Sequence, residues 1–257
     1  MSPEFSRETG ARFTDEAARQ GFSGSISTVT RVLEAAKHGL TRAGEACSRN
    51  TLMRLHSVLN YLWVGHWMKS KGLRVGRRVD SREQVFGIAA QQTGDSEVLY
   101  LEFGVYRGRS MRIWSRLLRN PRSTLHGFDS FEGLPESWDL SAEKGHFALD
   151  GAIPVIEDSR VSFSKGWFSE TLPQFVLPPH ERLIVNFDAD LYSSTKTVLD
   201  FLKPYISVGT YLYFDEFQAR EHELKAFDEF LSETGWTFQP VAASRGLTHV
   251  LFQRTSI

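Results

Sequence analysis

The feature that most constrains the fold is an alternation of short apolar runs and helical segments that begins at residue 97. The runs have the length and the β-branched and aromatic content of strands, and stretches with helical periodicity lie between them. Parallel strands need long crossover connections, usually helices, so the pattern predicts a largely parallel, doubly wound α/β sheet covered on both faces. The predicted strands occupy residues 97–104, 123–129, 160–166, 182–188 and 209–217.

The C-terminal end departs from this alternation. Residues 236–244 and 248–254 have the pattern of two strands, and only Arg-Gly-Leu joins them. So short a connection leaves no room for a crossover helix and joins antiparallel strands. We therefore expect a terminal hairpin that adds an antiparallel strand to the sheet.

The first 94 residues have a helical texture. Apolar side chains recur at helical spacing in residues 27–40 and 50–68. Residues 81–94 open with Ser81 and Gln84 at capping-box spacing and close on a glycine, so a third helix is expected there. We predict an N-terminal helical extension over residues 1–94, with about the first 20 residues flexible, followed by one α/β domain over residues 95–257.

Composition excludes several classes of protein. The single cysteine, Cys47, leaves no intramolecular disulfide and no multi-cysteine zinc site. Residues 1–94 carry 14 Lys and Arg against 8 Asp and Glu, but these charges are scattered, so nucleic acid is not expected as a partner. No apolar run approaches the roughly 18 to 20 residues that span a bilayer, and the N-terminus lacks the apolar centre of a secretory signal. We expect a cytoplasmic protein that does not bind a membrane.

The carboxyl ends of the predicted strands are rich in acids and glycine. In open α/β sheets, ligands bind beyond the carboxyl ends of the strands, where the loops leave a crevice. Five polar endings at one edge therefore indicate a site for a polar ligand. In strand order, these endings are Glu102 and Gly104, Asp129, Gly166 and Trp167, Asp188 and Asp190, and Asp215 and Glu216.

The first two endings favour one class of cofactor. Gly104 and Gly108 allow a sharp turn before a helix, but they do not form the Gly-x-Gly-x-x-Gly pattern of dinucleotide sites. Glu102 would repel a diphosphate and attract a positively charged group, and Asp129, 27 residues further on, is placed to bind ribose hydroxyls. S-adenosylmethionine carries an ammonium, a sulfonium and no phosphate, so it fits better than NAD.

Five sequence motifs strengthen this interpretation. "EFGVYRGRS", "GFDSFEGLPE", "KGWFSETLP", "DADLYSST" and "FDEF", spread over residues 97 to 235, together resemble the macrocin O-methyltransferase family of class I methyltransferases. The resemblance implies a Rossmann-like methyltransferase domain over residues 95–257 that transfers a methyl group from S-adenosylmethionine to sugar hydroxyls of natural products. The N-terminal helices are not covered with equal clarity.

The resemblance also implies roles for individual residues. One group would surround the methionine part of the cofactor, Asp129 would hold the ribose, and a second group would line the adenosine. Taken without the resemblance, Trp167 and Phe168 fit core packing equally well. The methionine group is Glu102, Gly104, Tyr106 and Ser110, and the adenosine group is Ser130, Phe131 and Trp167.

Carboxylates after the fourth and fifth strands suggest a metal site. Asp188 and Asp215 end neighbouring strands of a doubly wound sheet, and Glu216 follows directly. Oxygen ligands without cysteine or clustered histidine favour a hard cation such as Mg²⁺, and the resemblance implies the same ion. Glu216 stands where the family pattern has aspartate, which makes it the least certain ligand. Asp190 is favoured as a loop or helix-capping residue, with Ser193 and Ser194 as rival caps.

Methyl transfer needs an aligned acceptor oxygen and a way to remove its proton. A metal chelated by two vicinal hydroxyls would serve both needs. The similar catechol methyltransferases have a lysine where this chain has Leu191, so the candidate bases are Asp188, His146 and His222. The polar loop over residues 136–160 is a candidate lid.

These arguments predict a metal-dependent O-methyltransferase acting on a sugar hydroxyl of a glycoside or a nucleotide-linked deoxysugar, and a homo-oligomer formed through the N-terminal helices. Two alternatives stay open. An NAD-dependent sugar oxidoreductase would need a Gly-x-Gly-x-x-Gly turn and a Tyr-x-x-x-Lys pair, and Tyr192 and Lys196 have that spacing after the wrong strand. A non-enzymatic nucleoside-binding or assembly module would leave the converging carboxylates without a role.

Overall fold

The structure, a computed structural model, describes residues 28–138 and 142–256, so the predicted flexible segment of about 20 residues lies outside it. These residues divide into two compact units, 28–48 and 49–256. The first contains helix α1, Thr28–Ala46, none of whose residues is buried. None of the helices described is long and apolar enough to cross a bilayer.

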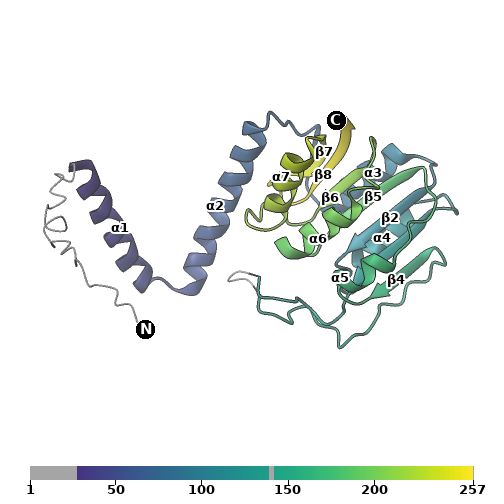
Figure 1. Cartoon of the computed structure of the whole chain (residues 1–257), viewed down its shortest axis with the longest axis horizontal. Helices are drawn as coiled ribbons and strands as arrows, with labels where there is room; N and C mark the ends of the chain where they lie inside the picture. The colour runs from purple at the N-terminus through teal and green to yellow at the C-terminus, as the bar shows by residue number, and fades with distance from the viewer. Residues whose placement is uncertain (1–27, 139–141, 257) are drawn as a thin grey trace, which may run out of the picture. The chain divides into compact units, whose positions relative to one another are not determined.

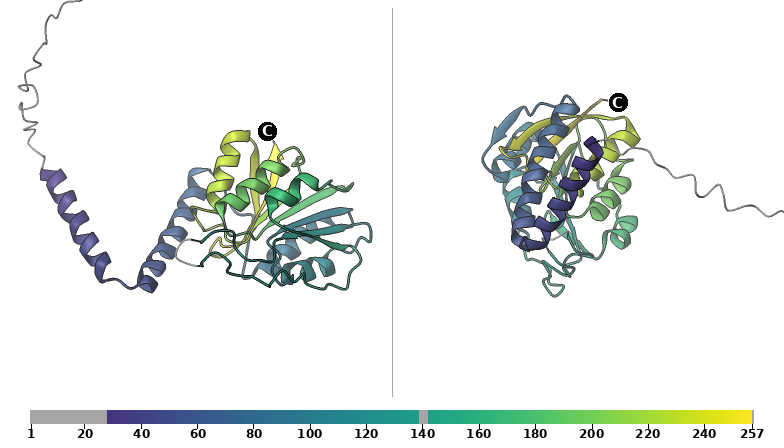
Figure 2. Two further views of the ribbon diagram at one scale, coloured as in Figure 1. Left: turned by 60° about the horizontal axis from the view of Figure 1, so that its bottom comes forward. Right: turned by 90° about the vertical axis from the view of Figure 1, so that its left-hand side faces the viewer.

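The second unit is a twisted sheet of eight strands with helices on both faces (Figures 1 and 2). The strand order is β1-β7-β8-β6-β5-β2-β3-β4. The strands are β1 Arg77–Val79, β2 Val98–Phe103, β3 Thr124–Asp129, β4 Val161–Lys165, β5 Arg182–Phe187, β6 Tyr211–Phe214, β7 Thr237–Ser244 and β8 Val250–Ser256. The helices are α2 Arg49–Ser70, α3 Arg82–Thr93, α4 Arg109–Leu117, α5 Phe168–Thr171, α6 Tyr192–Leu202 and α7 Glu223–Thr234, with a 3-10 turn at Leu172–Gln174.

The pairing of the strands matches the sequence pattern. Strands β2 to β6 are mutually parallel, and β8 is antiparallel to both β6 and β7, so the predicted terminal hairpin is confirmed. The short strand β1 was not predicted, and it adds to the sheet edge by pairing in parallel with β7. Both β1 and α3, which packs in the core beside β2, precede residue 95 in the chain.

Alternation along the strands builds two separate cores. One face of the sheet packs against α2, α6 and α7, and the other packs against α3 and α4 (Figure 1). On the first face, Trp67 of α2 is buried against Phe217 and Phe227, and its indole donates to Asp228 of α7 at 2.9 Å. This contact ties α2 to the sheet unit.

Two helix starts illustrate local sequence control and its limits. Helix α3 begins as predicted, because the hydroxyl of Ser81 accepts the backbone N–H of Gln84. Asp190 is a loop residue before α6, one of the two roles predicted for it, but the predicted capping roles of Asp190, Ser193 and Ser194 are wrong. The chain turns at Asp190 with φ of 60°, and Leu191 becomes the N-cap without any side-chain bond, so none of the proposed acid and serine side chains caps this helix.

A row of phenylalanines sets where the strands end. Phe128, Phe103, Phe187 and Phe214 are in register across β3, β2, β5 and β6. Neighbouring rings in the row are stacked, with centroids 4.9, 6.2 and 4.7 Å apart and interplanar angles of 10°, 29° and 9°. The next residue in each strand is Asp129, Gly104, Asp188 and Asp215 respectively, so four of the predicted site residues lie in one line at the carboxyl edge of the sheet.

Gly104 is where two of these strand ends meet most closely. It has φ of +92°, and a Cβ added there would overlap the backbone carbonyl of Asp188. Its own N–H donates to Phe128 at 3.0 Å, which ties the turn to β3 as well. Glycine is therefore required both for the backbone conformation and for the space.

We expect Gly104→Ala to lower the free energy of unfolding by about 2–4 kcal/mol, because the strand end must move to relieve the overlap. The matched control is Gly87→Ala in α3, where a Cβ meets nothing within 4 Å. The free energy of unfolding of that variant should rise by about 0.5–1 kcal/mol, because alanine has a higher helix propensity than glycine. Urea unfolding measures both, and equal stabilities of the two variants would contradict the argument.

Candidate functional site

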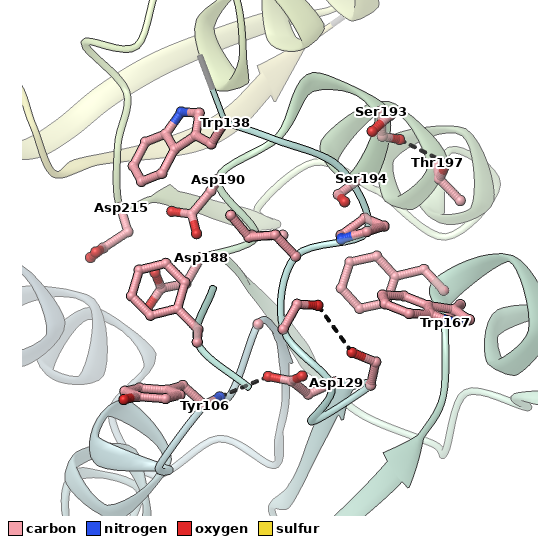
Figure 3. Close-up of a pocket in the computed structure, with 18 of the residues that line it drawn as sticks. Tyr106, Asp129, Trp138, Trp167, Asp188, Asp190, Ser193, Ser194, Thr197 and Asp215 are labelled. Carbon is pink, nitrogen blue, oxygen red and sulfur yellow. Dashed lines mark hydrogen bonds between the residues drawn. The ribbon is translucent and has the colours of Figure 1, made fainter. Parts of the chain in front are cut away.

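A cavity of about 460 Å³ opens at the carboxyl edge of the parallel strands (Figure 3). Residues that follow β2, β3, β4, β5 and β6 all reach it, as the census of strand endings predicts. Its wall includes Arg82, Gly104, Tyr106, Asp129, Ser130, Trp138, Phe147, Trp167, Asp188, Asp190, Ser193, Thr197, Asp215 and Glu216.

Asp129 organises the loops beside β2 and β3. One carboxylate oxygen accepts the backbone N–H groups of Val105 and Tyr106 at 2.8 and 2.7 Å, and the other accepts that of Phe131 at 2.7 Å. An ionised carboxylate has about two acceptor sites on each oxygen, so the oxygen that accepts Phe131 keeps a free lone-pair direction. Asp129 can therefore fix both turns and still accept a hydroxyl from the cavity.

Aromatic side chains form the walls on either side of Asp129. Trp167 lies at the N-terminus of α5, with its ring toward the cavity (Figure 3). Across the opening, the rings of Tyr106 and Phe147 meet edge to face at 5.4 Å. Tyr106 and Phe147 both have positive φ, 47° and 68°, a conformation that costs energy in residues with a side chain and that recurs at binding sites.

Several predicted residues lie behind the cavity wall. Glu102, Ser110 and Phe131 are buried and do not line the cavity. His146 is exposed outside the lining, with its ring 4.3 Å from that of Phe147. His222 is buried at the start of α7, where its Nδ1 accepts the N–H of Tyr192 at 3.3 Å. Their roles toward cofactor or acceptor stay predictions.

Glu102 belongs to a buried polar network beneath the cavity. Tyr100 donates its hydroxyl to Glu102 at 2.7 Å, and the amide of Asn186 in β5 donates to Tyr100 at 2.9 Å. Strand alternation places Tyr100 and Glu102 on one face, so the bond is local. Burial raises the pKa of Glu102 to about 8, although the Tyr100 bond opposes the shift.

Asp188 and Asp215 do converge, as predicted from neighbouring strands, but a third side chain lies with them. One guanidinium nitrogen of Arg82, Nη1, lies 3.1 and 3.0 Å from the two carboxylate oxygens of Asp215. The same nitrogen lies 3.7 Å from Asp188. Arg82 is the first residue of α3, and it reaches this edge because α3 begins there and runs back toward the start of β2.

The remaining contacts make Asp215 the more strongly held carboxylate. Tyr213 donates its hydroxyl to Asp215 at 2.5 Å, and Nδ1 of His249 lies 3.2 Å from the same oxygen. Burial works to raise the pKa of Asp215, but the bond from His249 and the charge of Arg82 outweigh it and hold the pKa at about 2. Burial, followed by repulsion from Asp215 and Asp190, raises the pKa of Asp188 well above its usual range.

Two further acids border this pair. Burial, then repulsion from Glu216, raises the pKa of Asp190 to about 7. Glu216 accepts a bond from the amide of Gln218, and its backbone N–H donates at 3.0 Å to the buried carboxylate of Glu223. The cavity edge therefore concentrates more carboxylates than a single arginine can neutralise.

A sequence model of the macrocin-O-methyltransferase family (TylF) matches residues 76–243. The chain belongs to this family. The match covers most of the sheet unit, including Arg82 and every residue that lines the cavity.

Curated relatives support the same assignment over part of their length. The chain is 31% identical over 137 residues to the 8-demethyl-8-(2,3-dimethoxy-alpha-L-rhamnosyl)-tetracenomycin-C 4'-O-methyltransferase of Streptomyces olivaceus, covering 46% of this chain and 52% of that protein. It is 31% identical over 150 residues to the demethyldecarbamoylnovobiocin O-methyltransferase of Streptomyces niveus, covering 51% and 56%. The chain thus spans about half the length of the curated relatives it matches.

Solved structures show the fold. The calicheamicin methyltransferase CalS11 superposes with a TM-score of 0.54 at 24% identity, over 66% of this chain and 77% of that one. The O-methyltransferase NovP superposes with a TM-score of 0.52 at 25% identity, over 68% of this chain and 79% of that one. The predicted class I methyltransferase fold, a doubly wound and mostly parallel sheet with N-terminal helices, is confirmed.

The acids at the cavity edge were predicted to bind a divalent cation. Asp188 and Asp215 offer hard oxygen donors at the cavity edge, the chemistry that Mg²⁺ prefers. Within residues 28–138 and 142–256, however, no three Asp, Glu, His or Cys side chains converge on one point. The two carboxylates fit a cation once Arg82 leaves them, and Glu216 would have to release Gln218 to join.

Three residues at the acidic pair were not predicted as part of the site: Arg82, Tyr213 and His249. Tyr213 carried a usable signal, because Tyr213 and Asp215 are two residues apart in a strand and must share a face. Arg82 and His249 carried none, since each reaches Asp215 from a distant segment.

The pH dependence of stability tests the Glu102 network. A raised pKa in the folded state means that Glu102 contributes stability below its unfolded pKa of about 4.5, and that this contribution is lost as the pH rises through about 8. Glutamine keeps the acceptor for Tyr100 and cannot ionise. The free energy of unfolding of Glu102→Gln minus that of wild type should therefore increase by at least about 1 kcal/mol from pH 6 to pH 9. This corresponds to about 2–4 °C in the difference of melting temperatures.

Thermal unfolding at the two pH values measures this difference. Glu143→Gln, in the exposed loop after β3, controls for the loss of one charge. A difference between Glu102→Gln and wild type that stays constant with pH would refute the assignment of a raised pKa.

Proposed function

We propose that the protein is an S-adenosylmethionine-dependent O-methyltransferase. The observation that carries this proposal is the convergence of five strand ends on one cavity, with Asp129 at the end of β3 and an acidic pair at the ends of β5 and β6. The acceptor we propose is a sugar hydroxyl of a natural-product glycoside or of a nucleotide-linked deoxysugar. The rhamnosyl group in the name of the Streptomyces olivaceus relative supports a glycoside.

We place the cofactor along the β2, β3 and β4 ends of the cavity. When bound there, S-adenosylmethionine supplies an electrophilic methyl group on a sulfonium. Asp129 would accept a ribose hydroxyl at the carboxylate oxygen that also accepts the N–H of Phe131. Trp167 would cover the adenine, and the turn at Gly104 would let the methionine part approach the backbone. Glu102 lies behind this turn and does not line the cavity, so it would act on the methionine end by supporting the strand end rather than by contact.

The acceptor would then lie toward β5 and β6, between the acids and the aromatic rim. The rings of Tyr106 and Phe147 offer apolar faces for the C–H side of a sugar. The oxygen that forms the new bond to the methyl group must lose its proton, and the carbon–sulfur bond breaks as the sulfide leaves. Asp188 lines the cavity, and its carboxylate is the first candidate to accept that proton. His146 remains the second candidate base.

A divalent cation, most simply Mg²⁺, is part of the proposal. Asp188 and Asp215 would hold it, with Glu216 as a further ligand, and it would supply a positive charge beside the acceptor hydroxyls. A homo-oligomer formed through the N-terminal helices and a cytoplasmic location also remain proposals. Exposed apolar side chains of α1, among them Val32 and Leu33, agree with the former.

Binding of the cofactor product tests the class of protein. Calorimetry with S-adenosylhomocysteine should show binding to wild type and weaker binding to Trp167→Ala, because a lost aromatic stack on a base costs about 1–3 kcal/mol. That loss corresponds to roughly 5- to 150-fold in Kd. Trp63→Ala, on α2 and away from the cavity lining, is the matched control.

If wild type binds no S-adenosylhomocysteine, the methyltransferase proposal is refuted. The alternatives, an NAD-dependent sugar oxidoreductase or a non-enzymatic binding module, would then be favoured. Binding that Trp167→Ala leaves unchanged would refute only the placement of the adenine.

The metal is tested by methyl transfer from labelled cofactor to a panel of deoxysugar nucleotides and glycosides. Chelator should abolish transfer and Mg²⁺ should restore it. Asp188→Asn and Asp215→Asn should each lower the rate of methyl transfer at least 100-fold, since either change removes the charge of a ligand. The control, Asp95→Asn before β2, should retain the wild-type rate. Full activity in chelator would leave an acid/base mechanism without a metal.

A further inference from the structure

Arg82 occupies the place that a cation would take between Asp188 and Asp215. Its guanidinium contacts both oxygens of Asp215 and lies 3.7 Å from Asp188. The side chains are largely withdrawn from solvent, with exposed fractions of 21% for Arg82, 26% for Asp188 and 9% for Asp215. In such an environment two carboxylates this close need a positive partner, and Arg82 supplies it.

The contacts of Asp215 are unevenly shared between its two carboxylate oxygens. Arg82 donates to both oxygens, and Tyr213 and His249 contact one of them. The second oxygen, Oδ2, faces Arg82, and the same guanidinium nitrogen faces Asp188, so an ion that bridges the two carboxylates must take the place of Arg82. A divalent cation and the positively charged guanidinium of Arg82 would also repel each other beside one carboxylate, so Arg82 is the partner that the cation replaces.

The way each partner is held leads to the same conclusion. Tyr213 is fixed within β6 and is fully buried. His249 is anchored by its second contact, at 2.9 Å, to the backbone carbonyl of Asp215. Arg82 is the first residue of α3, its long side chain lines the cavity, and there is open space for it to move into.

We propose that Arg82 is a built-in competitor of the divalent cation. It neutralises Asp188 and Asp215 while the metal is absent, and its side chain leaves them when the metal binds. This inference rests on the metal site of the proposed function, and it adds a residue that sets how tightly the ion is held. Arg82 acts as a positioning residue for the two carboxylates.

Binding of Mn²⁺ alone, followed by the electron paramagnetic resonance of the free ion, tests the proposal on the full chain. Arg82→Gln should bind Mn²⁺ at least tenfold more tightly than wild type, because the competing charge is gone. Arg82→Lys, which keeps the charge, should bind less tightly than Arg82→Gln. The matched control is Arg122→Gln, which removes an arginine paired with Glu97 at 3.1 Å near the start of β2 and should equal wild type.

The outcomes separate this inference from the proposed function. Equal or weaker Mn²⁺ binding by Arg82→Gln overturns the competition while leaving a metal-dependent enzyme possible. If no variant binds Mn²⁺, both the competition and the metal site are overturned, although binding of S-adenosylhomocysteine can still support a methyltransferase.

A second measurement needs no variant that might fail to fold. In wild type labelled with ¹⁵N-arginine, the Nε–H signal of Arg82 should shift as Mg²⁺ is added, and Arg82→Lys serves to assign it. The signal of Arg160, which is held by Asp158 away from the cavity, should stay in place. An Arg82 signal unmoved at saturating Mg²⁺ would overturn the proposal.

Discussion

The parallel register of β3, β2, β5 and β6 is the constraint on which the site depends. Stacked phenylalanines occupy the last buried position of each strand, and the register between neighbours aligns them. Whatever follows a phenylalanine must therefore emerge at the same edge. In this chain Asp129, Gly104, Asp188 and Asp215 follow, so a packing interaction in the core positions the polar groups of the cavity.

That alignment has an electrostatic cost, because it concentrates carboxylates where little water can screen them. The structure offsets the cost in different ways at different depths. Beneath the cavity, Glu102 is stabilised by Tyr100 and has a raised pKa. At the cavity edge, Arg82 and His249 keep Asp215 ionised while the pKa of Asp188 rises. These acids are the ones that the proposed function uses to hold a cation or to accept a proton.

Much of this architecture was accessible from the sequence. The βα alternation predicted the parallel sheet, the short Arg-Gly-Leu turn predicted the terminal hairpin, and Ser81 marked the start of α3. The convergence of Asp188 and Asp215 followed from their positions after neighbouring strands. The Tyr-x-acid spacing of β2 and β6 was an unused signal, since alternation alone places each tyrosine beside its acid.

The sequence by itself determined which elements form and which residues stand at the strand ends, because strand period, helix period and caps are local properties. Only the tertiary structure decided what surrounds those residues. Arg82 and Asp215 are 133 positions apart, and no local pattern relates the start of α3 to the end of β6. Their contact exists because β1 ends at the carboxyl edge and α3 begins there, beside a buried pair of acids that requires a positive charge.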